Sequence, residues 1–295
     1  MAEVPSSVRL NGAVFASTGR LFVTSGNVAG LYDPRHNRWT TTALPTQMAD
    51  HQLFTPVWTG HIVVLAGISE LTKSPMLAVA AYNVADKTWQ MITPHLPRRH
   101  EPGAVAMVAT RHKVILWSMW ARSARTKNGG TIYSGVDVLA LRDGKWTPIT
   151  GNWPQHRIVG GAAFANLQIL IPPGQFWCGP CPAPFSESPA KFADSGSLAL
   201  TTIPNSPLVT GPLIQPPIWL WNGSTVVAAD ETGDGAAAPE GRLGRLAAYL
   251  PWSHRWHLLP NAPGKPSLAA PPILTRQQLL VLTQSGRLMA LGKRG

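Results

Sequence analysis

The chain has 295 residues, of which 44% are hydrophobic and only 13% are charged. This apolar content is enough for a buried core and excludes a disordered chain, while 28 Pro and 27 Gly exclude a protein of long helices. Lys and Arg outnumber Asp and Glu by 25 to 14, so the formal charge is +11 and a polyanionic partner must be considered. The excess reflects few acids as much as many bases, so nucleic acid is not the expected partner.

Targeting signals are weak. No apolar run reaches the length of a membrane-spanning helix, so no membrane span is expected. Residues 1–7 contain Glu3 and no Lys or Arg, unlike a secretion leader. We expect a cytoplasmic chain if Met1 is its native start and a secreted chain if an export signal has been removed. The sequence does not indicate an oligomeric state.

Paired strands follow one another along the chain. Six segments each contain two runs of apolar and β-branched residues around a short turn, which predicts β-hairpins at residues 13–26, 55–67, 104–118, 161–174, 218–230 and 272–286. Downstream of these lie segments that begin with Tyr or Leu, turn at Asp, Pro or Gly, and end with Trp seven residues later, at 32–39, 82–89, 139–146 and 249–256. A degenerate copy without Trp spans 198–204.

Each hairpin and the segment after it supply four antiparallel strands roughly every 50 residues, the pattern of a β-propeller blade. With these repeats the chain resembles the kelch family and the galactose-oxidase central-domain-like superfamily, although the kelch glycine pair is reduced to Ser25-Gly26 and Ala66-Gly67. The resemblance implies an all-β, six-bladed propeller of four-stranded antiparallel blades that occupies residues 1–295 as one domain. The expected blades are 10–46, 47–100, 101–157, 158–216, 217–266 and 267–295.

Ring closure follows from counting strands. The last unit has room for three strands, while residues 5–10 form a strand without a blade. We therefore predict that this N-terminal strand completes the last blade and removes an exposed sheet edge. The Trp residues that end the repeated segments are interpreted as blade-packing residues: Trp39, Trp89, Trp146 and Trp256.

One face of the propeller is predicted to bind a ligand. The connections between second and third strands are long at 119–134, 175–196 and 231–244, and long loops in compact folds are commonly functional. Arg forks onto carboxylate, sulfate or phosphate, and Trp stacks on sugars or bases. The alternative is that these side chains only cover blade edges. The candidate ligand-binding residues are Trp120, Arg122, Arg125, Lys127, Arg98, Arg99, Trp153, His156 and Arg157, with His95 and His100 on the same connections.

Cys178 and Cys181 lie in a pentapeptide, Trp-Cys-Gly-Pro-Cys, that resembles the thioredoxin active site. That chemistry needs a helix to begin at the first cysteine and lower its pKa, and three prolines among the next eight residues do not continue a helix. We interpret the pair as a local disulfide or as free thiols that pin a long loop. Thiol redox activity is a lesser hypothesis.

Two functions remain open. The leading hypothesis is a binding module that recognises an acidic protein or an anionic or glycan ligand. The alternative is a carbohydrate-active enzyme with its site at the central opening of the same face, using His or carboxylate groups that the sequence does not single out. No metal or cofactor is expected, since the His residues lack metal-binding spacing apart from His254 and His257 on a predicted turn.

Overall fold

The computed structural model describes the chain in two compact units, residues 4–157 and residues 158–295, which are considered separately. Within them, the described residues are 12–15, 21–25, 27–33, 36–49, 51–53, 56–69, 75–97, 100–110, 113–126, 129–150, 157–158, 163–165, 168–171, 174–176, 186–188, 190–194, 199–208, 218–221, 224–232, 242–261, 264, 266, 268, 272–274, 279–283, 285 and 287–291. No helix in this described part of the chain has the length and apolar character needed to cross a membrane.

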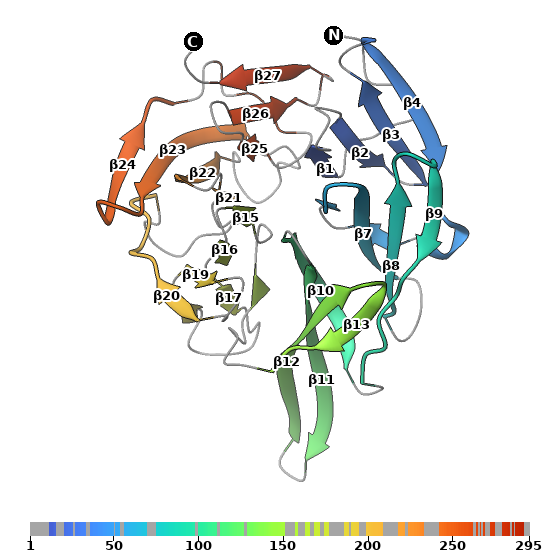
Figure 1. Ribbon diagram of the computed structural model, residues 1–295. Coiled ribbons are helices and arrows are strands. Elements are labelled where there is room, and N and C mark those ends of the chain that lie inside the picture. The colour runs from blue at the N-terminus through green and yellow to red at the C-terminus, as the bar shows by residue number, and fades with distance from the viewer. Residues whose placement is uncertain are drawn as a thin grey trace. The chain divides into compact units, whose positions relative to one another are not determined.

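The first unit contains three antiparallel sheets (Figure 1). The first runs in the order β1 (Gly12–Phe15), β2 (Leu21–Ser25), β3 (Val28–Asp33) and β4 (Arg38–Ala43). After a 3-10 turn, η1 (Thr46–Met48), the second contains β5 (His51–Leu53) and β6 (Val57–Trp58), both beside β7 (Ile62–Ser69), then β8 (Leu77–Asn83) and β9 (Thr88–Met91). The third is β10 (Glu101–Ala109), β11 (Val114–Thr126), β12 (Gly129–Arg142) and β13 (Lys145–Pro148).

The second unit continues the same plan. Two four-stranded sheets have the orders β15 (Ala163–Ala165), β16 (Gln168–Ile171), β19 (Lys191–Asp194), β20 (Leu200–Thr202) and β21 (Ile218–Trp221), β22 (Val226–Thr232), β23 (Arg242–Leu250), β24 (Arg255–Leu259). A three-stranded sheet follows, β25 (Ile273–Leu274), β26 (Leu279–Leu282) and β27 (Leu288–Leu291). A small sheet pairs β14 (Arg157–Ile158) with β17 (Gly174–Phe176), which also pairs with β18 (Ser186–Ser188).

The all-β prediction, with antiparallel sheets in a β-propeller arrangement, is confirmed. Five sheets of four or more strands are found among the described residues, where six were predicted, and the last sheet there has three. The predicted closing strand, residues 5–10, lies outside the described residues, so its pairing with the last sheet remains a prediction.

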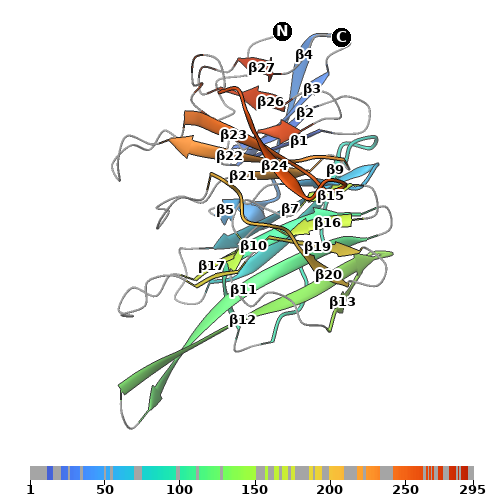
Figure 2. The same ribbon diagram turned by 90° about the vertical axis from the view of Figure 1, so that its left-hand side faces the viewer.

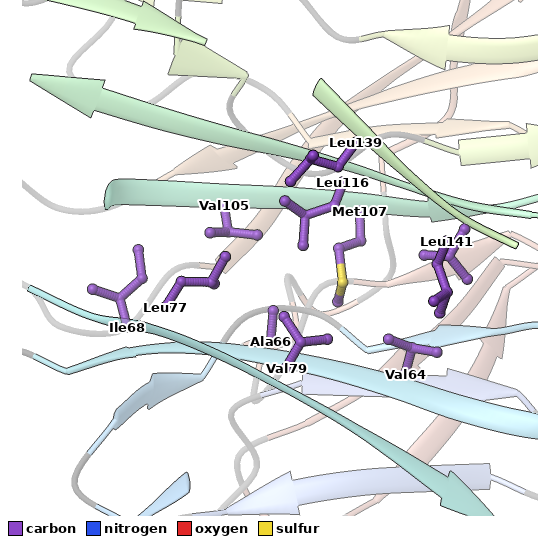
Figure 3. Close-up of a cluster of buried hydrophobic side chains, with 11 residues drawn as sticks. Val64, Ala66, Ile68, Leu77, Val79, Val105, Met107, Leu116, Leu139 and Leu141 are labelled. Atoms are coloured by element: carbon purple, nitrogen blue, oxygen red, sulfur yellow. The ribbon is translucent and has the colours of Figure 1, made fainter. Parts of the chain in front are cut away.

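Neighbouring sheets of each unit pack through apolar side chains that alternate along the strands. On β7, Val64 and Ala66 face the β10–β13 sheet, where they meet Leu116 in one cluster (Figure 3). Val63 and Leu65 belong to a second cluster shared with the first sheet. Because a strand points successive side chains to opposite faces, a strand packed on both faces must be apolar at every position. This requirement explains the uninterrupted β-branched runs in the sequence.

The repeated Tyr and Trp lie opposite each other on the two outer strands of a sheet. The distance between the two ring centroids is 5.1 Å for Tyr32 and Trp39, 4.9 Å for Tyr82 and Trp89, and 5.3 Å for Tyr249 and Trp256. Burial raises the pKa of the Tyr82 and Tyr249 phenols. Trp89, Trp146 and Trp256 each pack against a core between two sheets, which confirms their predicted role.

Candidate functional site

The third sheet carries an extended β-hairpin where the sequence predicted a loop. Strand β10 pairs with β11 only as far as Ala121, and β13 begins pairing with β12 at Leu139. Beyond Ala121, residues 122–126 pair only with residues 129–133, which we name the β11–β12 arm. Figure 1 and Figure 2 both show the arm projecting past the other strands of its sheet. A loop at 119–134 was therefore wrong.

The other two predicted loops are also partly structured. Strand β22 continues to Thr232 and β23 begins at Arg242, which shortens the segment expected at 231–244. Within 175–196, residues belong to β17, β18 and β19. In both segments, pairing with another strand provides the backbone hydrogen bonds of a sheet. The local composition alone did not indicate this pairing.

The arm lies in a stretch of sequence without acidic residues. Between Glu101 and Asp137 there is no Asp or Glu, while five Lys and Arg occur, at positions 111, 113, 122, 125 and 127. In the strand register Arg122 is opposite Tyr133 and Arg125 is opposite Gly130. A projecting hairpin with only positive formal charge creates a potential that attracts anions.

A His–Asp pair lies at the base of the arm. The Nδ1 atom of His100 is 2.7 Å from a carboxylate oxygen of Asp137, and their side chains are 25% and 19% exposed. A carboxylate only accepts hydrogen bonds, so Nδ1 is the donor. In the neutral imidazole the lone pair is then on Nε2, which can accept a proton or a hydrogen bond from a ligand.

Trp120 packs against the histidine of this pair. Its ring stacks on the His100 imidazole, with centroids 3.9 Å apart and an angle of 14° between the planes. A Cβ at Gly135 would lie 2.6 Å from the indole, so only glycine leaves room for Trp120 in this position. The indole is held between the Gly135 backbone and the imidazole, and this stacking fixes the plane of the His100 ring.

The sheet register places these groups on one face. Val114 and Leu116 enter the core between the second and third sheets, and Ser118 and Trp120 follow at the two-residue period of that face. Asp137 lies directly opposite Ser118. The His–Asp pair is therefore a polar continuation of the apolar core, at the end of the sheet from which the arm extends.

Two buried polar atoms beside the pair have no hydrogen-bond partner in the described part of the chain, Ser118 Oγ and Trp120 Nε1. Such atoms cost free energy when they are buried without a partner. Among the described residues no group of three or more His, Cys, Asp or Glu could hold a metal ion. The arrangement is suited to hydrogen bonding and proton transfer.

The predicted site residues fall into three groups. Trp120 is half-buried in β11 and contacts His100. Arg122 and Arg125 occupy backbone positions in β11, and Arg157 one in β14. The others lie outside the described residues: Arg98, Arg99, Lys127, Trp153, His156, Cys178 and Cys181. Their roles in binding therefore remain predictions.

Sequence reasoning missed Asp137 and Gly135, although one signal pointed toward this place. A histidine follows the repeated Trp by 12, 11 and 10 residues in the first three units, at His51, His100 and His156. His51 also donates from Nδ1, to the Ala49 carbonyl oxygen at 2.8 Å, so His51 and His100 share one neutral tautomer. His51 is the first residue of β5 and His100 directly precedes β10, while His156 lies outside the described residues.

Comparison with known proteins shows the fold. No family model and no curated protein matches the sequence. A solved structure titled "Structure of YjhT" is similar with a TM-score of 0.65 at 10% identity, over 99% of this chain and 95% of that chain. A chain of "Crystal Structure of Mitotic Checkpoint Complex" is similar with a TM-score of 0.55 at 11% identity, over 100% of this chain and 91% of that chain.

These structural neighbours are propellers, and the chain has a β-propeller-like arrangement. At this level of identity the likeness extends to the fold alone.

Proposed function

We propose that this propeller is a binding module that recognises an acidic protein surface or an anionic or glycan ligand through the β11–β12 arm and its base. The observation that carries the proposal is the projecting arm, which lies within 35 residues that contain no acid. Strand pairing orders the backbone at Arg122 and Arg125, so less conformational entropy is lost on binding than for the same residues on a free loop. Trp120 and His100 at the base add a polar contact of fixed orientation.

Charge reversal on the arm tests this proposal. We expect Arg122→Glu with Arg125→Glu to lower the salt concentration at which the protein elutes from a sulfated column. The reason is that the arm would make the main contacts with the sulfate groups. The matched control is Arg38→Glu with Lys145→Glu, which changes the net charge equally at exposed outer-strand positions. Equal elution shifts for the two double variants would mean that net charge, and not the arm, determines retention.

An enzymatic alternative is supported by one observation, the His100–Asp137 pair. An imidazole oriented by a carboxylate is a common proton acceptor in catalysis, and acid–base groups are what a carbohydrate-active enzyme requires. On a panel of aryl glycosides, His100→Gln and Asp137→Asn should each lower any turnover by about 100-fold. His95→Gln is the control, since His95 is exposed in the same connection. Absence of turnover across the panel, or turnover insensitive to His100→Gln, would reject this alternative.

We also propose the finer features of the fold, a kelch-like ring of six blades closed by residues 5–10. The support is the three-stranded last sheet, which lacks the fourth strand that five other sheets contain in the described part of the chain. For Cys178 and Cys181 the proposal is a local disulfide or thiol pair. Thiol titration with and without reductant distinguishes these two states, and insulin reduction by Cys178→Ser tests the redox hypothesis.

A further inference from the structure

The outer edge of the β21–β24 sheet exposes large apolar side chains. Four large hydrophobic residues are exposed in the described part of the chain, and three of them lie within eight positions here. Trp252 is 68% exposed, Leu258 69% and Leu259 37%. Together with the exposed His254, Arg255 and His257 they form the surface that we name the β24 edge. Clustered apolar exposure on a folded domain commonly marks an interaction site.

The repeat does not require this apolar character. The position two residues after the repeated Trp is Thr41 in β4, the half-buried Met91 in β9 and Pro148 in β13. Pro makes an outer edge unattractive to other strands, and Thr places a polar hydroxyl there instead of an apolar side chain. Leu258 stands at the corresponding position of β24 and is mostly exposed. The fold does not need an apolar side chain at this position, and exposing one to water costs free energy. We therefore interpret the exposed Leu258 as part of an interaction surface.

The charge of the β24 edge also differs from that of the other outer turns. Asp33, Asp86 and Asp143 lie in the corresponding segments of the first three sheets, whereas residues 249–256 contain Trp252 and no acid. Glu240 is the last acidic residue of the given sequence, and eight Lys and Arg follow it. Strands β23 and β24 and the turn between them therefore contribute basic and neutral side chains to the β24 edge and no acidic one.

In the described part of the chain, one side of β24 has no strand beside it. In the described sheet it pairs with β23 alone, so its outward N–H and C=O groups can bond to an added strand. We propose that the β24 edge binds an extended polypeptide segment in which acidic and apolar residues alternate, added to the sheet as a fifth strand. Main-chain hydrogen bonds hold the segment. Because successive side chains of a strand point to opposite faces, Leu258 contacts its apolar side chains on one face, and Arg255 and His257 contact its carboxylates on the other.

Two other occupants fit less well. A second copy of this chain would bring two acid-free edges together, and like charges opposite each other destabilise paired strands. A lipid surface would leave the outward backbone groups of β24 without hydrogen-bond partners in an apolar medium. This proposal concerns a different surface from the arm and is independent of the proposed anionic ligand.

The test uses the whole chain and a synthetic peptide of about ten residues that alternates Glu and Val. We expect the peptide to slow amide exchange in β24, and Trp252→Asp with Leu258→Glu to weaken its binding about tenfold or more, as for central interface residues. The milder variant Leu258→Ser, with melting curves for every variant, separates lost binding from lost folding. Thr41→Glu, at the matching position of β4, is the control and should leave binding within about twofold, since surface changes away from an interface have little effect.

Several results would overturn the inference. One is unchanged exchange in β24 with the Glu-Val peptide, and another is equal protection by a Lys-Val peptide or by a peptide whose central residues are proline. Protection of β24 by vesicles of phosphatidylcholine and phosphatidylserine, with no effect of the peptide, would indicate a membrane surface instead. A concentration-dependent dimer that Leu258→Glu dissociates would indicate self-association.

Discussion

At the scale of single residues, the repeated Trp has one role in common and one that varies. Each repeated Trp packs its ring against neighbouring aromatic or apolar side chains. Two of these Trp residues also donate an indole N–H to a backbone carbonyl of the segment that follows the preceding sheet. Trp146 donates to the Ile92 carbonyl oxygen and Trp256 to that of Pro204, at 2.9 Å in the second case. The Trp89 Nε1 atom is buried and has no hydrogen-bond partner among the described residues. Apolar packing is therefore the general contribution, and the bond between sheets is local.

This difference predicts unequal effects of the same substitution. Trp146→Phe should lower the free energy of unfolding by about 1–2 kcal/mol more than Trp89→Phe, because only the first change leaves a carbonyl group without its donor. Trp89→Phe keeps most of the ring and removes a buried donor that is already unsatisfied. Urea unfolding of both variants measures the difference. Losses of equal size would show that the Trp146 hydrogen bond contributes nothing net.

At the scale of elements, the tight turns before the repeated Trp share one backbone conformation. Asn37, Lys87, Asp143 and His254 all have positive φ, between 47° and 56°. Asn and Asp adopt this left-handed region comparatively easily, while a Lys gains nothing there that offsets the contact of its Cβ with the following carbonyl. The second sheet therefore carries a small strain at Lys87, beside the half-buried Trp89.

Relief of this strain is measurable. Lys87→Gly should raise the free energy of unfolding by about 1 kcal/mol, since glycine adopts positive φ without a steric penalty. Lys145→Gly is the control at the first, exposed position of β13, where glycine should lower stability by roughly 0.5–1 kcal/mol. A loss at Lys87 equal to that at Lys145 would contradict the strain at this turn. Thermal unfolding of the two variants gives the comparison.

The strands also show which structural features the sequence patterns could predict and which they could not. Alternating β-branched runs and Tyr-to-Trp segments predicted the four-stranded sheets, because side-chain period and turn residues are local properties. The arm was predicted as a loop, since Arg122, Arg125 and the glycines near its tip have low strand propensity and only pairing with residues 129–133 makes them a strand. The His100–Asp137 contact spans 37 positions. It depends on the register of β11 and β12, which no local pattern specifies.

At the scale of the whole molecule, charge is distributed in long acid-free stretches of sequence. Four stretches of 35 or more residues contain no acid, and two of them also contain five or more Lys and Arg. One of these two lies between Glu101 and Asp137 and contains the arm, and the other follows Glu240 and contains the β24 edge. The +11 net charge is therefore not spread evenly along the sequence, because many of the Lys and Arg residues lie in these two regions. Each region combines positive charge with an exposed or projecting strand, so we propose two interaction surfaces with different partners.

The last sheet offers a test of the proposed closing strand. In the described part of the chain β27 pairs with β26 alone, where five other sheets have a fourth strand. If residues 5–10 supply that strand, deletion of residues 1–10 should cost about 3 kcal/mol and lower the melting temperature by roughly 6–12 °C. Deletion of residues 292–295 is the control and should leave melting unchanged. A synthetic peptide of residues 1–12, added in excess, should restore melting to the shortened chain by mass action. Melting like that of the intact chain would show that the N-terminal segment closes nothing.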